Sequence, residues 1–240
     1  MNLTDRILMD ISATTALVTG ANRGFGRALA RELLARGATV YAAARNPDLI
    51  DLPGARPLAL DITDPASVAA AAATAGDVTL LVNNAGSSTG ADLLTGDLDQ
   101  IRLEMETHYL GTLSVVRAFA PVLERNGGGT ILNVLSALSW FALPTDGAYV
   151  AAKAAEWGLT NSLRLTLAPA KIRVAGLHVG FMDTDMTRAV TAPKADPAQV
   201  AAYAVDHLAA DAYEIVADDV SRDVRARLSG GVAALYPQLP

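Results

Sequence analysis

Short apolar runs alternate with longer amphipathic segments throughout this chain of 240 residues. The short runs are continuously apolar, which is typical of parallel strands buried on both faces of a sheet. They predict seven strands, at 13–18, 39–44, 56–60, 78–82, 130–135, 173–179 and 213–216. The longer segments have helical spacing and predict helices at 27–36, 65–74, 98–125, 147–168 and 197–209. This alternation predicts an α/β fold in which helices cover both faces of a mostly parallel, seven-stranded sheet.

Two stretches depart from this rhythm. The connection between the second and third strands, residues 45–55, contains Pro47 and Pro53 and is short for a crossover helix. We therefore expect an abbreviated link there. The segment from about 211 to 240 becomes charged after its apolar run, and we expect its stretch 221–228 to be a helix with a solvated face. The length of the chain favours a single domain over residues 1–240.

Residues 19–26 join the first predicted strand to the first helix and read Thr-Gly-Ala-Asn-Arg-Gly-Phe-Gly. Glycines there let the backbone approach a pyrophosphate, and the N–H groups of the helix N-terminus bind its charge. The turn predicts a dinucleotide site, although a tight structural turn would share these features. Its candidate cofactor-binding residues are Gly20, Asn22, Arg23, Gly24, Phe25 and Gly26.

The end of the second strand indicates which dinucleotide is bound. A carboxylate at this point would bind the ribose 2′-hydroxyl and favour NAD. This chain has Ala44 there, followed by Arg45, and Arg23 in the glycine turn supplies a second cation. Two guanidinium groups suit a 2′-phosphate, so the sequence predicts NADP(H). Taken singly, either arginine could instead be a solvated surface residue.

Tyr149 and Lys153 are four residues apart in the predicted helix 147–168, which places them on one helix face. A tyrosine normally titrates near ~10, too high for acid–base work at neutral pH. A neighbouring ammonium is expected to lower the pKa of the phenol, which could then give a proton to a carbonyl oxygen or take one from an alcohol. Alone, this pair fits a buried tyrosine beside a surface lysine better than a catalytic pair.

Ser136 strengthens the catalytic interpretation of that pair. It ends the fifth strand, and ligands of doubly wound sheets gather outside the carboxyl ends of the strands. Its hydroxyl is expected to point into the same crevice and to orient a substrate oxygen. Ser139 is the competing serine, but it lies beyond the end of the strand.

As a set, these motifs resemble the short-chain dehydrogenase/reductase family in its compact, single-domain form. The resemblance runs from residue 13 to residue 187 and includes Asn83-Asn84-Ala85-Gly86. It implies a doubly wound, Rossmann-type domain that moves a hydride between a nicotinamide and a ketone or secondary alcohol. It also implies that Lys153 holds the nicotinamide ribose. Further cofactor contacts that it implies are Asp61 and Ile62 at the adenine, Asn83, Ala85 and Gly86 in a supporting turn, and Gly180 and Thr184 near the nicotinamide.

One position on the long helix departs from the family's pattern. The family usually has an asparagine shortly before the glycine that matches Gly111, where it supports a water-linked proton relay to the lysine. Counting back from Gly111 places His108 at that position. A histidine both donates and accepts hydrogen bonds, so His108 could take part in catalysis through the relay or change proton delivery. A packed histidine without a catalytic part is the alternative.

The C-terminal segment and Val179 also differ from the family. Many relatives end with a tail that builds a tetramer, whereas this chain has a charged run after 213–216. The tetramer is therefore in doubt, and we expect a homodimer through the long helices 98–125 and 147–168. Val179 replaces a common proline before Gly180, and little effect is expected because valine also permits an extended turn. We expect His178, just before it, to be a satisfied strand residue.

The predicted substrate pocket includes a variable loop at about 181–197. Its candidate walls are Ser87, Ser88, Leu138, Trp140, Phe141, Leu143, Val179, Met182 and Met186. None is charged, which favours an uncharged, rather hydrophobic ketone or secondary alcohol as the substrate. Trp140 and Phe141 could equally be buried beneath the loop.

Composition excludes several other classes of function. The net charge of −6 argues against general binding of nucleic acid or anionic membranes. The chain has no cysteine and only three widely spaced histidines, so no metal site is expected. The lack of cysteine also leads us to expect a cytoplasmic location. A catalytically inactive NADP(H) sensor on the same fold is the main alternative function. An epimerase or dehydratase of the longer family branch is disfavoured, because it would need a further substrate domain.

Overall fold

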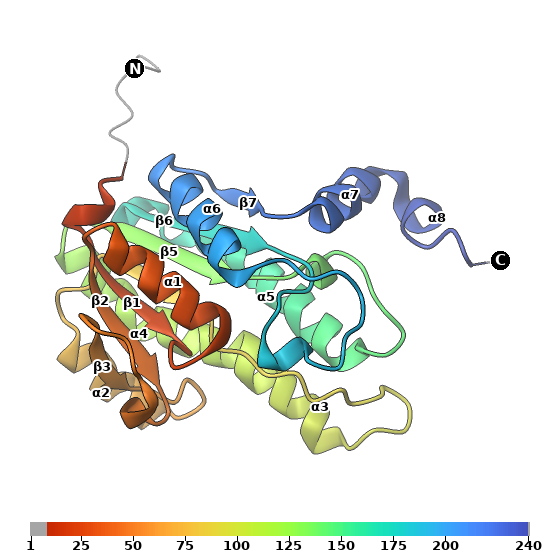
Figure 1. Cartoon of the computed structure of the whole chain (residues 1–240), viewed down its shortest axis with the longest axis horizontal. Helices are drawn as coiled ribbons and strands as arrows, with labels where there is room; N and C mark the ends of the chain where they lie inside the picture. Colours follow the sequence, from red (N-terminus) through yellow and green to blue (C-terminus); the bar gives the residue numbers. More distant parts are fainter. Residues whose placement is uncertain (1–8, 240) are drawn as a thin grey trace, which may run out of the picture.

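The computed structural model describes residues 9–239, so the ends of the predicted domain, residues 1–8 and 240, lie outside it. Within this range, seven parallel strands form one sheet in the order β3-β2-β1-β4-β5-β6-β7 (Figure 1). Their bounds are β1 (Thr15–Thr19), β2 (Thr39–Ala44), β3 (Arg56–Ala59), β4 (Leu80–Asn83), β5 (Gly129–Val134), β6 (Ile172–His178) and β7 (Glu214–Val216). The predicted doubly wound α/β fold is confirmed, and all described strand pairs are parallel. The strand order reverses between β1 and β4, where such sheets open a ligand crevice.

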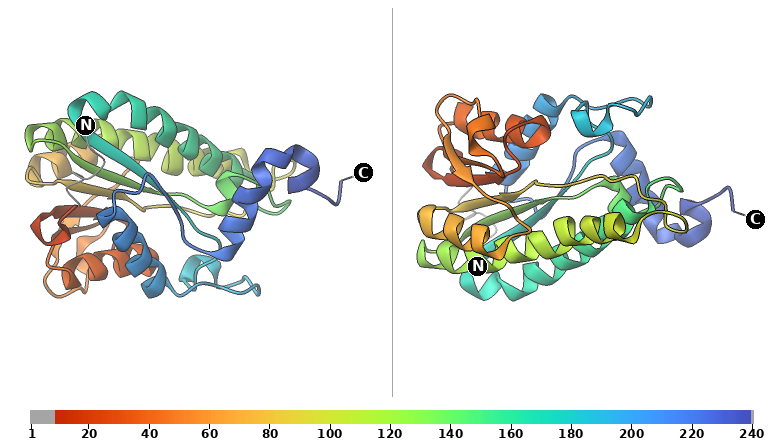
Figure 2. Two further views of the ribbon diagram at one scale, coloured as in Figure 1. Left: turned by 90° about the horizontal axis from the view of Figure 1, so that it is seen from above. Right: turned by 90° about the horizontal axis from the view of Figure 1, so that it is seen from below.

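Helices cover both faces of the sheet (Figure 2). On one face α1 (Gly24–Ala35) packs against α6 (Pro197–Ala209), and on the other lie α2 (Pro65–Thr74), α4 (Thr112–Arg125) and α5 (Gly147–Thr166). Each face has its own apolar core, the first around Leu29 and Leu33 and the second around Phe119 and Leu123. No helix in this described range is long and apolar enough to cross a membrane.

The link between β2 and β3 is as short as the sequence predicts. It holds only a 3₁₀ turn, Pro47–Leu49, whose first amide is capped by the side chain of Asn46. Proline fixes the backbone at the start of such a turn, and eleven residues leave no room for a packed crossover helix.

The long helix predicted at 98–125 is interrupted, which corrects that prediction. It consists of α3 (Leu98–Met105), a π-helical turn (Glu106–Gly111) and α4. Gly111 ends this turn, where a β-carbon would lie only 3.0 Å from Ile62 and from the Glu106 carbonyl. The wider turn places Thr107 and His108 in the interior.

The C-terminal segment extends beyond the carboxyl edge of the sheet as α7 (Asp219–Arg227) and α8 (Gly231–Leu235) (Figure 1). The predicted helix is present, but its face is not simply solvated. Val224 is buried against Trp140 and Val216. Asp218 caps α7 by accepting a 2.8 Å hydrogen bond from the Ser221 amide, and its other oxygen accepts a 2.6 Å bond from the Gly180 amide. These bonds attach the segment to the end of β6.

Candidate active site

The predicted catalytic side chains meet at the carboxyl end of β5. Lys153 is buried, and its Nζ donates hydrogen bonds of 2.7 Å to the Val134 carbonyl and to Glu156 Oε2. The same nitrogen lies 5.8 Å from the centroid of the Tyr149 ring. Ser136 lies two residues beyond the end of β5, near enough to the phenol to lower the pKa of Tyr149. One strand end and one helix face thus bring the three groups together.

The structure distinguishes Ser136 from Ser139, the two candidate serines. Ser139 Oγ donates a 2.6 Å hydrogen bond to the Ser136 carbonyl and lies 3.1 Å from His178 Nδ1. Its hydroxyl is therefore committed to internal partners. Ser136 Oγ accepts a 3.1 Å bond from the Leu138 amide, which leaves the hydroxyl proton for another acceptor. This arrangement favours Ser136 as the serine that faces a ligand.

The pKa of Tyr149 is raised, contrary to the expectation from its spacing to Lys153. Burial raises it most, and the Lys153 ammonium lowers it as expected. The carboxylates of Glu156 and Glu104 raise it again, because a phenolate near two anions is unfavourable. The spacing of Tyr149 and Lys153 in the sequence indicates the effect of the ammonium on this pKa but not that of the two carboxylates.

Lys153 is held in its charged form despite its burial. Burial lowers the pKa of the ammonium, but Glu156, together with Tyr149 and Glu104, more than offsets this, and the net pKa is raised. Glu156 is itself buried, and its second oxygen, Oε1, accepts a 3.2 Å hydrogen bond from Thr112 Oγ1 on α4. The pair therefore forms a fixed ion pair inside the protein.

His108 lies directly behind Tyr149. The two rings meet edge to face, with centroids 5.2 Å apart. His108 Nε2 lies 2.9 Å from the Ser87 carbonyl and 3.3 Å from Glu104 Oε2, which are acceptors, and 3.3 Å from the Ser87 amide, which is a donor. Nδ1 faces Glu156 Oε2 at 3.9 Å and has no hydrogen-bond partner. The histidine thus stands between two carboxylates.

Glu104 completes this group, which we call the buried charge network: Glu104, His108, Lys153 and Glu156. The Glu104 carboxylate accepts hydrogen bonds from Ser87 Oγ, at 2.9 Å, and from the Thr89 amide. Although burial opposes it, these bonds and that of His108 lower the pKa of Glu104 to about 2. Both glutamates were missed from the sequence. Their only sequence signal is an acidic residue one helical turn from His108 or Lys153.

The glycine turn after β1 has the shape that a bound pyrophosphate needs. Gly20 and Gly24 have positive φ angles of 67° and 56°, which favour glycine. A β-carbon at Gly26 would collide with Asn84 and with the backbone of Gly20. Arg23 precedes α1 without a side-chain cap, so the first N–H groups of this helix are open to an anion. The residues present therefore fit a dinucleotide phosphate.

Cations lie on the exposed side of this turn. Arg23 and Arg45 are exposed, and Arg23 Nη1 lies 3.6 Å from Asp185, where both side chains remain largely open to solvent. Burial opposes ionisation of Asp61, but hydrogen bonds from Thr63 lower the pKa of its carboxyl, and the nearby Arg45 lowers it further. The Asp61 carboxylate accepts a 3.0 Å bond from the Thr63 amide, and Ile62 is buried beside it.

The Asn83–Gly86 turn is fixed by residues that the sequence did not single out. Thr19 Oγ1 accepts 2.9 Å hydrogen bonds from the amides of Asn84 and Ala85. Asn83 points into the protein instead, where its side chain donates a 2.8 Å bond to Asn133. A β-carbon at Gly86 would lie 2.7 Å from the His108 ring, so the turn rests on the buried charge network.

Comparison with known proteins agrees with this geometry. A family model described as short chain dehydrogenase matches residues 14–195. The chain belongs to the short-chain dehydrogenase family. Membership makes it an oxidoreductase of the kind that acts on alcohol and carbonyl groups.

Three relatives illustrate the range of this family. A short chain dehydrogenase from Burkholderia cenocepacia, solved in complex with NADP, is 39% identical with a TM-score of 0.92, covering 96% of this chain and 99% of that one. The 3-oxoacyl-[acyl-carrier-protein] reductase FabG of Salmonella typhimurium is 34% identical, over 76% of this chain and 79% of its own length. A 3-ketodihydrosphingosine reductase from Bacteroides thetaiotaomicron is 30% identical, over 71% and 65%.

In this short-chain dehydrogenase the predicted pocket walls divide into buried and open residues. Leu138 and Val179 are buried, while Trp140 lies beneath the C-terminal segment, stacked on His178 with ring centroids 3.6 Å apart. Of the two alternatives for Trp140, a pocket wall or a buried residue, the structure has the buried residue. Phe141 packs on the same cluster. The remaining predicted walls are half-buried Ser87, Leu143 and Met182 and exposed Ser88 and Met186, while Gly180 and Thr184 are half-buried.

His178 is only partly satisfied. Its Nδ1 lies 3.3 Å from the Ser136 carbonyl, but Nε2 is buried without a hydrogen-bond partner. Burial lowers the pKa of its imidazole to about 3, so the ring is neutral at physiological pH. A neutral ring suits its position against Trp140.

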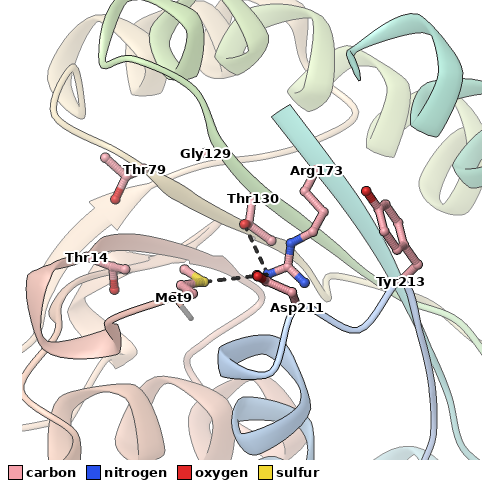
Figure 3. A pocket seen from close by; sticks show the side chains of 8 residues that line it. All are labelled: Met9, Thr14, Thr79, Gly129, Thr130, Arg173, Asp211 and Tyr213. Carbon is pink, nitrogen blue, oxygen red and sulfur yellow. Dashed lines mark hydrogen bonds and ion pairs between the residues drawn. The ribbon is translucent and has the colours of Figure 1, made fainter. Parts of the chain in front are cut away.

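A cavity of about 420 Å³ lies at the other edge of the sheet, among the amino ends of the strands (Figure 3). Arg173 is its most polar wall, and its guanidinium donates hydrogen bonds to Thr130 Oγ1 and to the carbonyls of Leu208 and Ala212. These bonds tie strands to the end of α6. The cavity is therefore remote from Tyr149, and its arginine has a structural part.

Proposed function

We propose that this protein is an NADP(H)-dependent oxidoreductase that transfers a hydride between the nicotinamide and a ketone or secondary alcohol. The observation that carries the proposal is the meeting of Ser136, Tyr149 and Lys153 at the end of β5, beside the open N-terminus of α1. The three side chains would bind the oxygen of the substrate and transfer its proton. The N-terminus of α1 would bind the phosphates of the dinucleotide.

The preference for NADP(H) rests on charge. Ala44 is where an acidic side chain would bind the 2′-hydroxyl of NAD, and Arg45 follows it. Arg45 and Arg23 are exposed and would hold the 2′-phosphate in bidentate hydrogen bonds. The relative from Burkholderia cenocepacia, solved with NADP, supports the same choice. Asp61, Ile62, Gly180 and Thr184 would complete the cofactor site.

The catalytic residues would divide the work as follows. When bound, the nicotinamide supplies or accepts the hydride. Ser136 orients the substrate oxygen through its free hydroxyl proton. Tyr149 gives the proton of its hydroxyl to the carbonyl oxygen during reduction and takes one from the alcohol during oxidation. Lys153 holds the nicotinamide ribose and opposes the rise of the Tyr149 pKa.

His108 would take the place of the family's asparagine behind Lys153. It touches the Tyr149 ring and lies between Glu104 and Glu156. It is therefore placed to pass a proton between the loop at Ser87 and Lys153. A substrate without charge suits the apolar residues Phe141, Leu143 and Met182 around the loop of 181–197. Two relatives are named for reduction of a keto group, which supports a ketone as the reducible substrate.

We further propose a homodimer through the long helices. Exposed leucines lie along α3, the π turn and α5: Leu98, Leu103, Leu110 and Leu165. Such apolar side chains on an open surface are typical of an interface. The lack of cysteine favours the cytoplasm. Light scattering of the purified protein, with a Leu110→Glu variant as comparison, tests the dimer, and a monomeric wild type would contradict it.

The experiment that tests the function is a panel of uncharged ketones incubated with NADPH. We expect consumption of NADPH matched by formation of alcohol, and slower reaction with NADH. The alternative function, an inactive NADP(H) sensor, is kept in view by His108 in the asparagine position. Tight binding of NADPH without turnover of any ketone would favour the sensor and contradict the enzyme.

A further inference from the structure

Burying the charge network in the protein interior has an unfavourable desolvation free energy. Its members are 0% (Glu104), 1% (His108), 5% (Lys153) and 2% (Glu156) exposed. Charges removed from water cost several kcal/mol each unless they are paired and hydrogen-bonded. An apolar side chain at position 156, on the buried face of α5, would avoid this cost. The arrangement therefore calls for a specific explanation.

Glu156 first determines where the lysine amine lies. Its carboxylate is held from α4 by Thr112 and holds Lys153 Nζ at 2.7 Å. The Val134 carbonyl takes a second proton of the ammonium. Two of the three donors are thus fixed inside the protein, which leaves one direction for a ligand. Lys153 is presented to the crevice in a single orientation.

Glu156 also changes what this lysine does to Tyr149. The ammonium lies 2.7 Å from a carboxylate but 5.8 Å from the centroid of the phenol ring. The carboxylate therefore opposes part of the stabilisation that the ammonium gives to a phenolate. The groups that face Tyr149 are Lys153 and Glu156 from α5, Glu104 from α3 and His108 from the π turn. Glu156 and Glu104 both oppose loss of the phenol proton, in agreement with the raised pKa of Tyr149.

His108 links the two carboxylates. Its Nε2 side binds Glu104 and the Ser87 carbonyl, and its unpartnered Nδ1 faces Glu156. The ring lies against Tyr149, so the network encloses the phenol on the side away from the crevice. The negative groups are buried, so they act on the ring from the protein interior, where electrostatic effects are strong.

From this geometry we infer that Glu156 is a positioning residue, whose carboxylate fixes Lys153 and keeps Tyr149 in its proton-donating form. The inference rests on the proposed function and states that the site favours reduction of the ketone over oxidation of the alcohol. In reduction a hydride joins the carbonyl carbon, the Oη–H bond of Tyr149 breaks, and its proton joins the oxygen to give the alcohol. The phenolate then regains a proton from solvent. Reduction needs the phenol and oxidation needs the phenolate, so Glu156 extends reduction to higher pH and delays oxidation.

The test measures the ionisation of Tyr149 directly, in the cofactor-free protein. Tyrosine labelled with carbon-13 at Cζ reports the charge of each phenol by NMR, and the Tyr149→Phe variant assigns the resonance. We expect Glu156→Gln to lower the titration midpoint of Tyr149 by about one pH unit or more. The onset of alcohol oxidation should move to lower pH by a similar amount. A residue that only supported packing would leave the midpoint unchanged.

Glu106→Gln is the matched control, because Glu106 is an exposed acid near His108. It should leave the midpoint of Tyr149 unchanged. If Glu156→Gln fails to fold, Glu156→Leu removes the same charge. Lys153 Nζ then keeps only its bond to the Val134 carbonyl, and a shift of the midpoint in the same direction is expected. An unmoved midpoint in the folded variant, or an equal shift in the control, would overturn the inference.

The two proposals fail in distinguishable ways. If the midpoint shifts but Tyr149→Phe retains turnover, the electrostatic role of Glu156 stands and the proposed catalytic role of Tyr149 falls. If Tyr149→Phe is inactive and the midpoint does not shift, the proposed function stands and the role of Glu156 falls.

Discussion

The two sides of the active-site crevice are built in different ways. On the cofactor side, the turn of 19–26 offers backbone N–H groups and positive φ glycines, and the charged groups Arg23 and Arg45 are exposed. On the lysine side, the buried charge network places four ionisable side chains in the interior. The first side binds with main chain and solvated cations. The second tunes chemistry with charges held out of water.

This difference matters because the same charge has unequal weight in the two places. An exposed arginine is screened by water and salt, so its effect is local and modest. A buried carboxylate acts at low dielectric and reaches neighbouring groups with little screening. We therefore expect substitutions on the lysine side to change both stability and pH dependence, and substitutions on the cofactor side to change affinity.

The largest effect is expected from Lys153→Met, which leaves Glu156 buried without its cation. Removing one partner of a buried pair destabilises by about 3–5 kcal/mol, and urea unfolding at neutral pH would measure this. The double variant Lys153→Met/Glu156→Leu should regain most of the loss, because neither charge then remains. Equal stability of the single and double variants would show that the pair is not coupled.

The next effect concerns Glu104 and acid. Its pKa falls from the ordinary 4.5 to about 2 in the folded protein. A lowered carboxyl pKa gives stability that is present above the unfolded value and is lost as pH falls from about 4.5 through about 2, worth about 3 kcal/mol. Glu104→Gln should flatten the dependence of the free energy of unfolding on pH in that window. Glu106→Gln should keep the wild-type slope. A wild-type slope in Glu104→Gln as well would show that the buried Glu104 is not the source of the pH dependence.

The smallest effect is expected on the cofactor side. Arg45→Ala should weaken NADPH by about tenfold while NADH changes little, since only NADPH carries the 2′-phosphate. Arg31→Ala, an exposed arginine on α1, is the matched control. Fluorescence titration with both cofactors measures the affinities. Equal losses for NADPH and NADH would show that Arg45 does not read the 2′-phosphate.

The sequence was sufficient for the fold because its signals are local. Continuous apolar runs and proline or glycine boundaries gave all seven strands and the short link at 45–55, each within about two residues. The continuous helix at 98–125 was wrong, because a π turn interrupts it at Glu106–Gly111, where Gly111 packs closely against Ile62, a residue far away in the chain. Tertiary crowding of this kind leaves no periodic signal.

The site was predicted unevenly for the same reason. Tyr149 and Lys153 share a helix face, so their spacing was informative. The roles of Glu104 and Glu156 depend on α3, the π turn and α5 packing together, and only that packing turns ordinary helical acids into buried charges. Lys153 lowers the pKa of Tyr149 as predicted, but burial and these carboxylates outweigh it, so the net pKa is raised. Asn83 was another partial success, because its turn lies beside the site while its side chain points inward.

The most direct test of the central claim is Tyr149→Phe, compared with the wild type in NADPH-dependent reduction of a ketone. The phenyl ring keeps the packing against His108 but has no proton to give. We predict a loss of about 10²–10⁴-fold in kcat/KM with nearly unchanged affinity for NADPH, because general acid catalysis contributes about that much. Wild-type turnover in the variant would contradict the claim that Tyr149 is the proton donor of this enzyme.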